Sequence, residues 1–301
     1  MMKIKMKICM IFFLAIIFSL GIAGCDDSSP SLLDAATQGN VVMVKSLLSK
    51  GADANAKTKK DGGTPLIAAS YFGYVEVVKL LLENGAEVNA KRTNDGGTSL
   101  SVACQEGHAE VVKLLIENGA DINAKSTDLG VTPLFIASLM GHIEVIKLLL
   151  GNGADVNVKT TDSGRTPLNI ASQEGHIEVA KLLLGNGADV NVKTTDLGVT
   201  HLYIASQEGH AEVVKLLIEN GADVNAKSTG YYGATPLIIA SQKGHTKIVK
   251  LLLKNGADVN VERTDNGKTP LFIASEKGYV EIVRLLENAG RKETARGHLD
   301  N

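Results

Sequence analysis

The sequence contains no tryptophan, and aromatic residues make up only 4% of its 301 positions. A hydrophobic core therefore has to be built from leucine, isoleucine, valine and alanine. An excess of basic residues is also missing, since 31 lysines and arginines stand against 33 aspartates and glutamates. Binding to nucleic acid needs clustered lysine and arginine side chains against the phosphates. The composition therefore excludes a nucleic-acid-binding function.

A Thr-x-Leu motif recurs along most of the chain at an almost constant spacing. The intervals between successive copies are 34, 34, 34, 34, 35 and 34 residues. The motif is followed by Gly-His or Gly-Tyr, an apolar run and, in most copies, Asn-Gly-Ala-(Asp/Glu)-x-Asn. The motif threonines are Thr64, Thr98, Thr132, Thr166, Thr200, Thr235 and Thr269. A fixed period of this length predicts one array of stacked supersecondary units rather than two globular domains.

The copy that begins at Thr132 indicates how one unit folds. Threonine is a good N-cap residue, and Pro133 suits the first position of a helix because no N–H partner is needed there. We therefore expect a first helix over residues 134–140 and, after a glycine, a second helix over residues 143–150. The apolar stripe of the second helix is too wide for one facing partner, so neighbouring units must cover it on both sides. The polar loop of residues 155–164 predicts a hairpin-like finger.

This pattern resembles the ankyrin repeat, whose period is close to 33 residues and whose motif is Thr-Pro-Leu-His-x-Ala. The resemblance implies an all-α, ankyrin-like solenoid of about eight helix–turn–helix repeats with finger loops, over residues 31–290. Residues 31–60 would form an N-terminal cap, full repeats would follow from residue 61, and residues 269–290 would form a C-terminal cap. Residues 291–301 would be a polar tail.

One position departs from the ankyrin motif in every copy. The motif histidine is missing, and its position is held by Ile67, Ser101, Phe135, Asn169, Tyr203, Ile238 and Phe272. The hydrogen bonds that the family usually makes there are therefore not expected, and the position becomes more apolar.

The first residues of the chain belong to a different class of segment. Three lysines precede an apolar run over residues 8–23, which is shorter than the roughly 20 residues that a membrane-spanning helix needs. A positive start, a short apolar run and small residues at its end are typical of a cleaved export signal. An uncleaved N-terminal anchor is the alternative.

The Ile-Ala-Gly sequence before Cys25 resembles the signal of bacterial lipoproteins, in which the cysteine becomes lipid-modified and the new N-terminus. On this resemblance residues 1–24 are a signal peptide, Cys25 is the lipidation site, and residues 25–30 are a polar tether. Removal of the signal lowers the formal net charge from −2 to −5, because three lysines leave with it.

The other two cysteines and one unusual histidine offer no catalytic group. Cys9 lies in the predicted signal, so with Cys25 lipidated no intramolecular disulfide is possible in the mature chain. Cys104 stands where most copies carry serine, and no base recurs beside it, so we interpret it as a packing residue. His201 replaces the motif proline and has no catalytic companion.

Two recurring polar patterns, the turn histidines and the Asp-x-Asn loops, resemble metal-binding motifs, but neither meets the requirements of a metal site. Equivalent histidines in stacked repeats lie about 8–10 Å apart, whereas zinc ligands lie about 2 Å from the metal. The loop Asp155-x-Asn157-x-Lys159 has lysine where a calcium loop needs oxygen. We therefore predict no metal, no cofactor, no catalytic residue and no small-molecule substrate. The turn histidines are His108, His142, His176, His210 and His245.

Recognition of another protein is the remaining function. In proteins that resemble ankyrin repeats, partners dock on the finger tips and on the exposed face of the first helix. Most residues at these positions are polar, but some are apolar, and the sixth finger carries one extra residue beside two tyrosines. Exposed aromatic side chains are the usual anchors of an interface. The predicted contact residues are Tyr71, Phe72, Leu139, Met140, Tyr203, Tyr231 and Tyr232. Tyr203, like Phe135 and Phe272, has the alternative role of filling the gap left by the motif histidine.

The sequence thus predicts a non-catalytic scaffold that is exported and lipid-anchored at a bacterial membrane, periplasmic or at the cell surface. It would bind a partner protein across the concave ankyrin surface. Two alternatives stay open: a surface-exposed or secreted effector or adhesin that binds a host protein, and a purely structural role in the envelope. An enzyme is disfavoured because no nucleophile–base pair and no metal cluster is evident.

Overall fold

The computed structural model describes residues 31–297, and within that range the chain forms sixteen helices and no strand. The chain divides after Asp155 into two compact units, the first unit and the second unit. The helices of the first unit are α2 (Leu32–Thr37), α3 (Val41–Ser49), α4 (Pro65–Phe72), α5 (Val75–Glu83), α6 (Ser99–Glu106), α7 (Ala109–Glu117), α8 (Pro133–Met140) and α9 (Ile143–Gly151). Those of the second unit are α10 (Pro167–Glu174), α11 (Ile177–Gly185), α12 (His201–Glu208), α13 (Ala211–Glu219), α14 (Pro236–Lys243), α15 (Thr246–Lys254), α16 (Pro270–Glu276) and α17 (Val280–Gly297).

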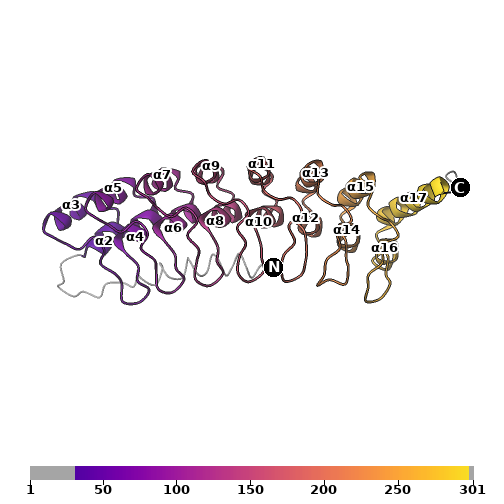
Figure 1. The fold of residues 1–301 in the computed structure, drawn as a ribbon, viewed down its shortest axis with the longest axis horizontal. Helices are drawn as coiled ribbons and strands as arrows, with labels where there is room; N and C mark the ends of the chain where they lie inside the picture. Colours follow the sequence, from indigo (N-terminus) through magenta and orange to yellow (C-terminus); the bar gives the residue numbers. More distant parts are fainter. Residues whose placement is uncertain (1–30, 298–301) are drawn as a thin grey trace. The chain divides into compact units, whose positions relative to one another are not determined.

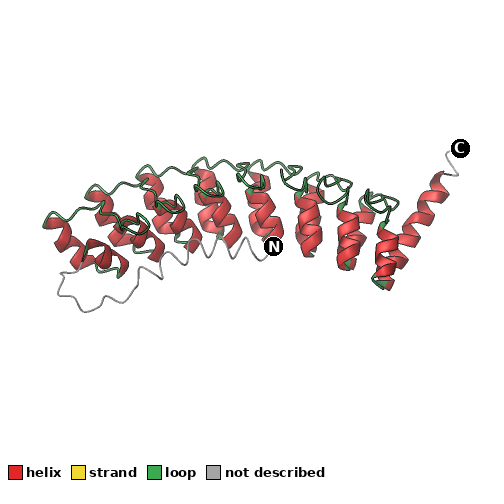
Figure 2. Ribbon diagram, turned by 90° about the horizontal axis from the view of Figure 1, so that it is seen from below, coloured by secondary structure: helices red, strands yellow, loops and turns green. Residues whose placement is uncertain are grey.

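In each unit the helices form pairs that stack in sequence order (Figure 1). In the first unit α2, α4, α6 and α8 form the layer of first helices, and α3, α5, α7 and α9 form the layer of second helices. In the second unit the even-numbered helices from α10 to α16 and the odd-numbered helices from α11 to α17 form the same two layers. Long loops join one pair to the next and extend away from the helices as fingers (Figure 2). The predicted all-α solenoid of helix–turn–helix units is confirmed.

The first helices begin and end where the motif predicts. Thr166 is the N-cap of α10, and its Oγ1 accepts a hydrogen bond from the Asn169 N–H while the Asn169 side chain accepts one from the Thr166 N–H. Pro167 takes the first helical position, where its missing N–H costs nothing. The helix ends at Gly175, whose φ of +75° lies in the left-handed region that glycine tolerates best. In all seven motif copies the threonine side chain accepts a hydrogen bond from the backbone N–H three residues later and so caps a first helix.

The core is built almost entirely from small and aliphatic side chains. Five of the second helices between α5 and α15 bury two β-branched residues and one leucine at the same three positions, and α11 has alanine at one of them. In α13 these residues are Val213, Val214 and Leu217, each at most 1% exposed. Among the described residues, the buried apolar side chains other than leucine, isoleucine, valine and alanine are Cys104, Phe135, Tyr203 and the five motif prolines. The core composition expected from the scarcity of aromatic residues is therefore confirmed.

An asparagine in each finger joins its repeat to the next one. In the second unit, Asn191 donates from Nδ2 to the Gly221 carbonyl at 3.1 Å and accepts at Oδ1 from the Asp223 N–H at 2.9 Å. Both partners are backbone groups of the following repeat. Equivalent pairs of bonds link the repeats at Asn55, Asn89, Asn157 and Asn225. The asparagine side chain thus acts as a two-bond clamp between adjacent fingers.

Replacing Asn191 with alanine is expected to lower the free energy of unfolding of the second unit by about 1–2 kcal/mol. The change removes two hydrogen bonds, each worth about 0.5–1.5 kcal/mol in a partly solvated site. Urea denaturation followed by circular dichroism measures the loss. The matched control is Lys215→Ala, which removes only an exposed ion pair to Glu219 at 3.8 Å and should cost at most about 0.5 kcal/mol. Equal losses in the two variants would contradict the clamp.

The last helix of the second unit extends into the segment that the sequence predicts as a polar tail. Helix α17 runs to Gly297, whereas the sequence placed the end of the array at residue 290 and a polar tail after it. In the other second helices from α5 onward, an asparagine side chain donates to the carbonyl four residues earlier and ends the helix, as Asn220 does to Leu216 at 2.8 Å. Ala289 stands at that position in α17. The missing cap explains why residues 291–297 continue the helix.

The predicted signal peptide (1–24), the lipidation site Cys25 and the tether (25–30) lie outside the described residues, as do residues 298–301 of the predicted tail. Within the range that the structure describes, none of the helices combines the length and the apolar character needed to cross a membrane.

Candidate functional site

Three of the predicted contact residues lie half-buried on first helices of the first unit. The rings of Tyr71 and Phe72 pack edge to face with their centroids 5.0 Å apart, and Phe72 also stacks on Tyr74 at 5.7 Å. Burial, together with the nearby Glu106 carboxylate, raises the pKa of Tyr71. Met140 is half-buried at the end of α8. All three side chains are therefore only partly accessible to a partner.

Two of the predicted contact residues are buried, which corrects their assignment to an exposed surface. Leu139 is 0% exposed and Tyr203 is 3% exposed. Consecutive residues of a helix point about 100° apart, and in the pair Leu139-Met140 Leu139 takes the inward position while Met140 stays half-buried. Tyr203 occupies the position of the missing motif histidine inside a core cluster with Val199, Ile238 and Ile273. Its alternative role, filling that gap, is the one that the structure supports.

The sixth finger projects the two most prominent tyrosines of the second unit. Tyr231 is 39% exposed and Tyr232 is 54% exposed. Tyr232 has a φ of +54°, and it is the only described residue other than glycine with a positive φ. A left-handed conformation costs a non-glycine residue about 1–2 kcal/mol. The extra residue of this finger therefore places a tyrosine where the backbone is strained.

Tyr203, on the first helix of the same repeat, and Arg263, in the next finger, hold the rings of these two tyrosines. Tyr231 stacks on the buried ring of Tyr203 with centroids 5.9 Å apart and planes within 5°. The Arg263 guanidinium lies 5.6 Å from the Tyr232 centroid and binds the Asp265 carboxylate with two bonds of 2.9 and 2.7 Å. The hydrogen bonds from Arg263 lower the pKa of Asp265. Stacking and a cation–π contact thus fix the rings of the tyrosine tip, by which we mean Tyr231 and Tyr232.

Phe272 is a second exposed aromatic residue in this unit, at 53% exposure. Lys268 Nζ lies 4.9 Å from its ring centroid and also pairs with Glu276 at 2.8 Å. The same position is buried in the six preceding copies, for example at Ile238. The burial of Phe272 cannot be predicted from the repeat pattern, because the copies have similar sequences. Whether the ring is covered depends on whether another repeat follows in the stack.

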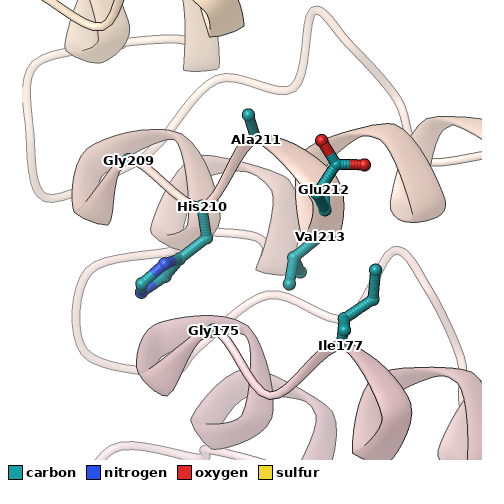
Figure 3. Close-up of a pocket in the computed structure, with 7 residues that line it drawn as sticks. All are labelled: Gly175, Ile177, Gly209, His210, Ala211, Glu212 and Val213. Carbon is teal, nitrogen blue, oxygen red and sulfur yellow. The ribbon is translucent and has the colours of Figure 1, made fainter.

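A shallow pocket of about 310 Å³ between two inter-helix turns contains a histidine and a carboxylate (Figure 3). The two side chains point in different directions. His210 Nε2 donates to the Gln173 carbonyl of the preceding repeat at 2.9 Å, and Glu212 pairs with Lys247 at 2.6 Å. The pocket therefore does not bring an acid and a base together.

The turn histidines hold neighbouring repeats together. Besides His210, the rings of His108, His142 and His245 each place Nε2 at 2.9–3.1 Å from a backbone carbonyl of the preceding repeat. These bonds between repeats support the structural interpretation of the turn histidines. Among residues 31–297, the structure contains no group of three or more potential metal-ligating side chains.

The remaining polar candidates also have structural roles. Asp223 Oδ1 accepts from the Asn225 N–H at 2.9 Å, so the calcium-like loops are closed by turns of their own. Cys104 is fully buried, and burial raises the pKa of its thiol, which removes its nucleophilic form. His201 is buried, donates from Nδ1 to the Val190 carbonyl at 2.9 Å, and has the Thr166 hydroxyl 3.1 Å from Nε2. Burial lowers the pKa of His201 to about 4.

Comparison with known proteins agrees with this architecture. A family model described as ankyrin repeats (3 copies) matches residues 32–126, 93–160, 125–194 and 202–296. A comparison with curated proteins gave no match.

Proposed function

Because the chain belongs to the ankyrin repeat family, whose members are generally scaffolds that bind other proteins, we propose that it is a non-catalytic scaffold for a partner protein. We place the partner on the face formed by the fingers and first helices. The observation that carries this assignment is the tyrosine tip, where two exposed rings stand on a strained backbone. Strain of this kind persists only where the surroundings enforce it, and it is found at ligand-binding segments.

The geometry of the tip suits an anchor for a protein partner. Tyr203 and Arg263 fix the rings before any partner arrives, so little side-chain entropy is lost on binding. Tyrosine is among the residues that contribute most to interfaces, since its ring buries a large area and its hydroxyl can donate a hydrogen bond. Tyr71, Phe72 and Met140 are proposed as further contacts on the first unit.

We also propose that the protein is exported and anchored by lipid at Cys25. The support is sequence alone: three lysines, the short apolar run and the Ile-Ala-Gly-Cys ending. Labelling of producing cells with radioactive palmitate tests the anchor. Wild type should carry the label, and Cys25→Ala should lose it and stay longer by the uncleaved signal. Protease treatment of intact cells separates a periplasmic scaffold from a surface effector or adhesin.

Replacing Tyr231 and Tyr232 with serine is expected to weaken partner binding roughly thirtyfold, which corresponds to about 2 kcal/mol for a central aromatic anchor. The partner is first captured by crosslinking on membranes of producing cells, and its affinity is then measured with purified proteins. The matched control is Val280→Ser, which removes an apolar side chain of the second unit that is 61% exposed but lies on a second helix. If the double variant has an unchanged circular dichroism spectrum and binds the partner with unchanged affinity, the tyrosine tip is not part of the interface.

A further inference from the structure

Helix α3 of the first repeat exposes two neighbouring valines, and the second of them, Val42, departs from the repeat pattern. Val42 is 81% exposed and Val41 is 39% exposed. In the seven later second helices the position of Val42 always carries a charge: Glu76, Glu110, Glu144, Glu178, Glu212, Lys247 and Glu281. All seven of these side chains are exposed, including those with a repeat on each side. A missing neighbour therefore does not explain the exposure of Val42, because the stack never covers this position.

The same substitution changes the electrostatics of α3. In α9 and α11 the glutamate at this position pairs at 2.7 Å with the lysine three residues later, Lys147 or Lys181. Lys45 is the corresponding lysine in α3, and Val42 takes the place of its carboxylate partner. No acidic residue occurs from Val41 to Lys50, whereas α5 and α7 each carry two. The outer face of α3 therefore combines exposed valines with Lys45, whose usual carboxylate partner is absent.

The first repeat as a whole shares this character. Residues 31–60 contain five lysines and two aspartates, although the whole chain carries a formal net charge of −2. Residues three or four apart on a helix are neighbours on its surface, so Lys45 lies beside both Val41 and Val42. An apolar patch bordered by lysines is the pattern of surfaces that lie in the interface of an anionic membrane.

The position of α3 in the chain favours the same partner. The proposed lipid site Cys25 stands only seven positions before the start of α2 at Leu32, and seven residues span at most about 25 Å even when fully extended. An anchored chain therefore keeps the first repeat close to the lipid headgroups whatever conformation the tether takes.

We propose that the outer face of α3, formed by Val41, Val42 and Lys45, lies together with the C-cap residue Lys50 on the anionic surface of the membrane to which the chain is anchored. This inference rests on the proposed lipid anchor. The valines enter the headgroup region and the lysines meet lipid phosphates. The contact fixes the orientation of the first unit relative to the membrane, which the acyl chains alone leave free.

The absence of tryptophan from the natural sequence provides a clean reporter. The full chain is purified in detergent from membranes of producing cells and reconstituted into vesicles that contain phosphatidylglycerol. In Val42→Trp we expect blue-shifted tryptophan emission and quenching by lipids brominated near the headgroup. The matched control is Glu144→Trp, at the same position in α9, whose emission should stay that of a solvated indole.

A second measurement uses a variant that the fold accepts. Val42→Glu restores the residue that six later repeats carry at this position, so it should fold normally. Amide hydrogen exchange of α3 should be slowed by phosphatidylglycerol vesicles in wild type and unchanged in Val42→Glu. Vesicles of phosphatidylcholine alone should give a smaller effect, because the lysines then lack anionic partners.

The outcomes separate this inference from the anchor. If the protein sediments with the vesicles but the Val42→Trp variant emits like the Glu144→Trp control, the contact is wrong and the anchor stands. If it does not sediment at all, both are wrong. A blue shift that needs no vesicles and grows with protein concentration would assign the face to a second copy of the chain and overturn the membrane contact.

Discussion

Replacing His201 with proline is expected to make the second unit about 2 kcal/mol more stable than wild type at pH 5, while the two proteins differ by at most about 1 kcal/mol at pH 7. Burial holds the pKa of His201 near 4 in the folded protein, against 6.5 for an exposed histidine. Between these values the unfolded chain binds a proton that the folded chain does not. The free energy of unfolding therefore falls as the pH drops through this window, by about 1.4 kcal/mol per pH unit at most.

Proline should fit this site without strain. Five of the seven motif copies carry proline there, and Thr200 before it is already extended, with φ −90° and ψ 168°. The Val190 carbonyl loses its hydrogen bond from His201, at a cost of about 1 kcal/mol. Proline also lowers the conformational entropy of the unfolded chain, which raises the free energy of unfolding by about 0.4–1 kcal/mol. These two effects nearly cancel at neutral pH.

Urea denaturation at pH 7, 6 and 5 gives the comparison. The matched control is Ser99→Pro in the first unit, which makes the same backbone change at the other departing copy and removes no titratable group. Its effect on stability should not depend on pH. If wild type and His201→Pro lose the same amount of stability between pH 7 and pH 5, His201 is not the titrating group.

Replacing Gly175 with alanine is expected to destabilise the second unit by roughly 3 kcal/mol. Its φ of +75° alone costs an alanine about 1–2 kcal/mol. The added Cβ would also lie 2.6 Å from His210 Nδ1, closer than carbon and nitrogen can approach. Either the ring moves and its hydrogen bond to the Gln173 carbonyl lengthens, or the two repeats separate, which adds roughly 1–3 kcal/mol.

A control in the same unit separates the two costs. Gly187 has a similar φ of +87°, and no atom lies within 4 Å of the place that an added Cβ would take, so Gly187→Ala should cost only the conformational term. In a His210→Ala background, Gly175→Ala should cost no more than Gly187→Ala. A double-mutant cycle from thermal unfolding measures the coupling between Gly175 and His210. A coupling near zero would mean that this contact does not limit how closely the repeats approach.

The repeating part of the fold is predictable from sequence because its determinants are local. Thr166, Pro167 and the turn glycine fix the start and end of a helix through bonds within a few residues. The burial of Tyr203 was harder to predict, because a histidine position filled by tyrosine fits both an exposed anchor and a core residue. Leu139 occupies the position that Tyr71 holds two repeats earlier, and the repeat position alone does not show that one is buried and the other half-buried.

Other features depend on interactions that a single repeat does not reveal. The strained backbone of Tyr232 results from one inserted residue. The repeat period shows that a residue is inserted, but it does not show where in the finger the extra residue lies. Phe272 looks like its buried equivalents, and only its place in the stack exposes it. The clamp by Asn191 joins residues 30 or more positions apart. The motif shows that an asparagine is present, but it does not show which groups its side chain binds.

Most hydrogen bonds between repeats are made to backbone groups, which every repeat possesses. The finger asparagines and the turn histidines both bind backbone atoms of a neighbour, so a whole 34-residue module finds the same partners wherever it is inserted. Gene duplication or deletion in register can then lengthen or shorten the array without a matching change elsewhere. Residues 107–121 and 209–223 are identical in sequence three modules apart, as such copying would leave them. An inserted tyrosine finger, by contrast, needs Tyr203 in its own repeat and Arg263 in the next one, and can be inherited only as a block of two modules.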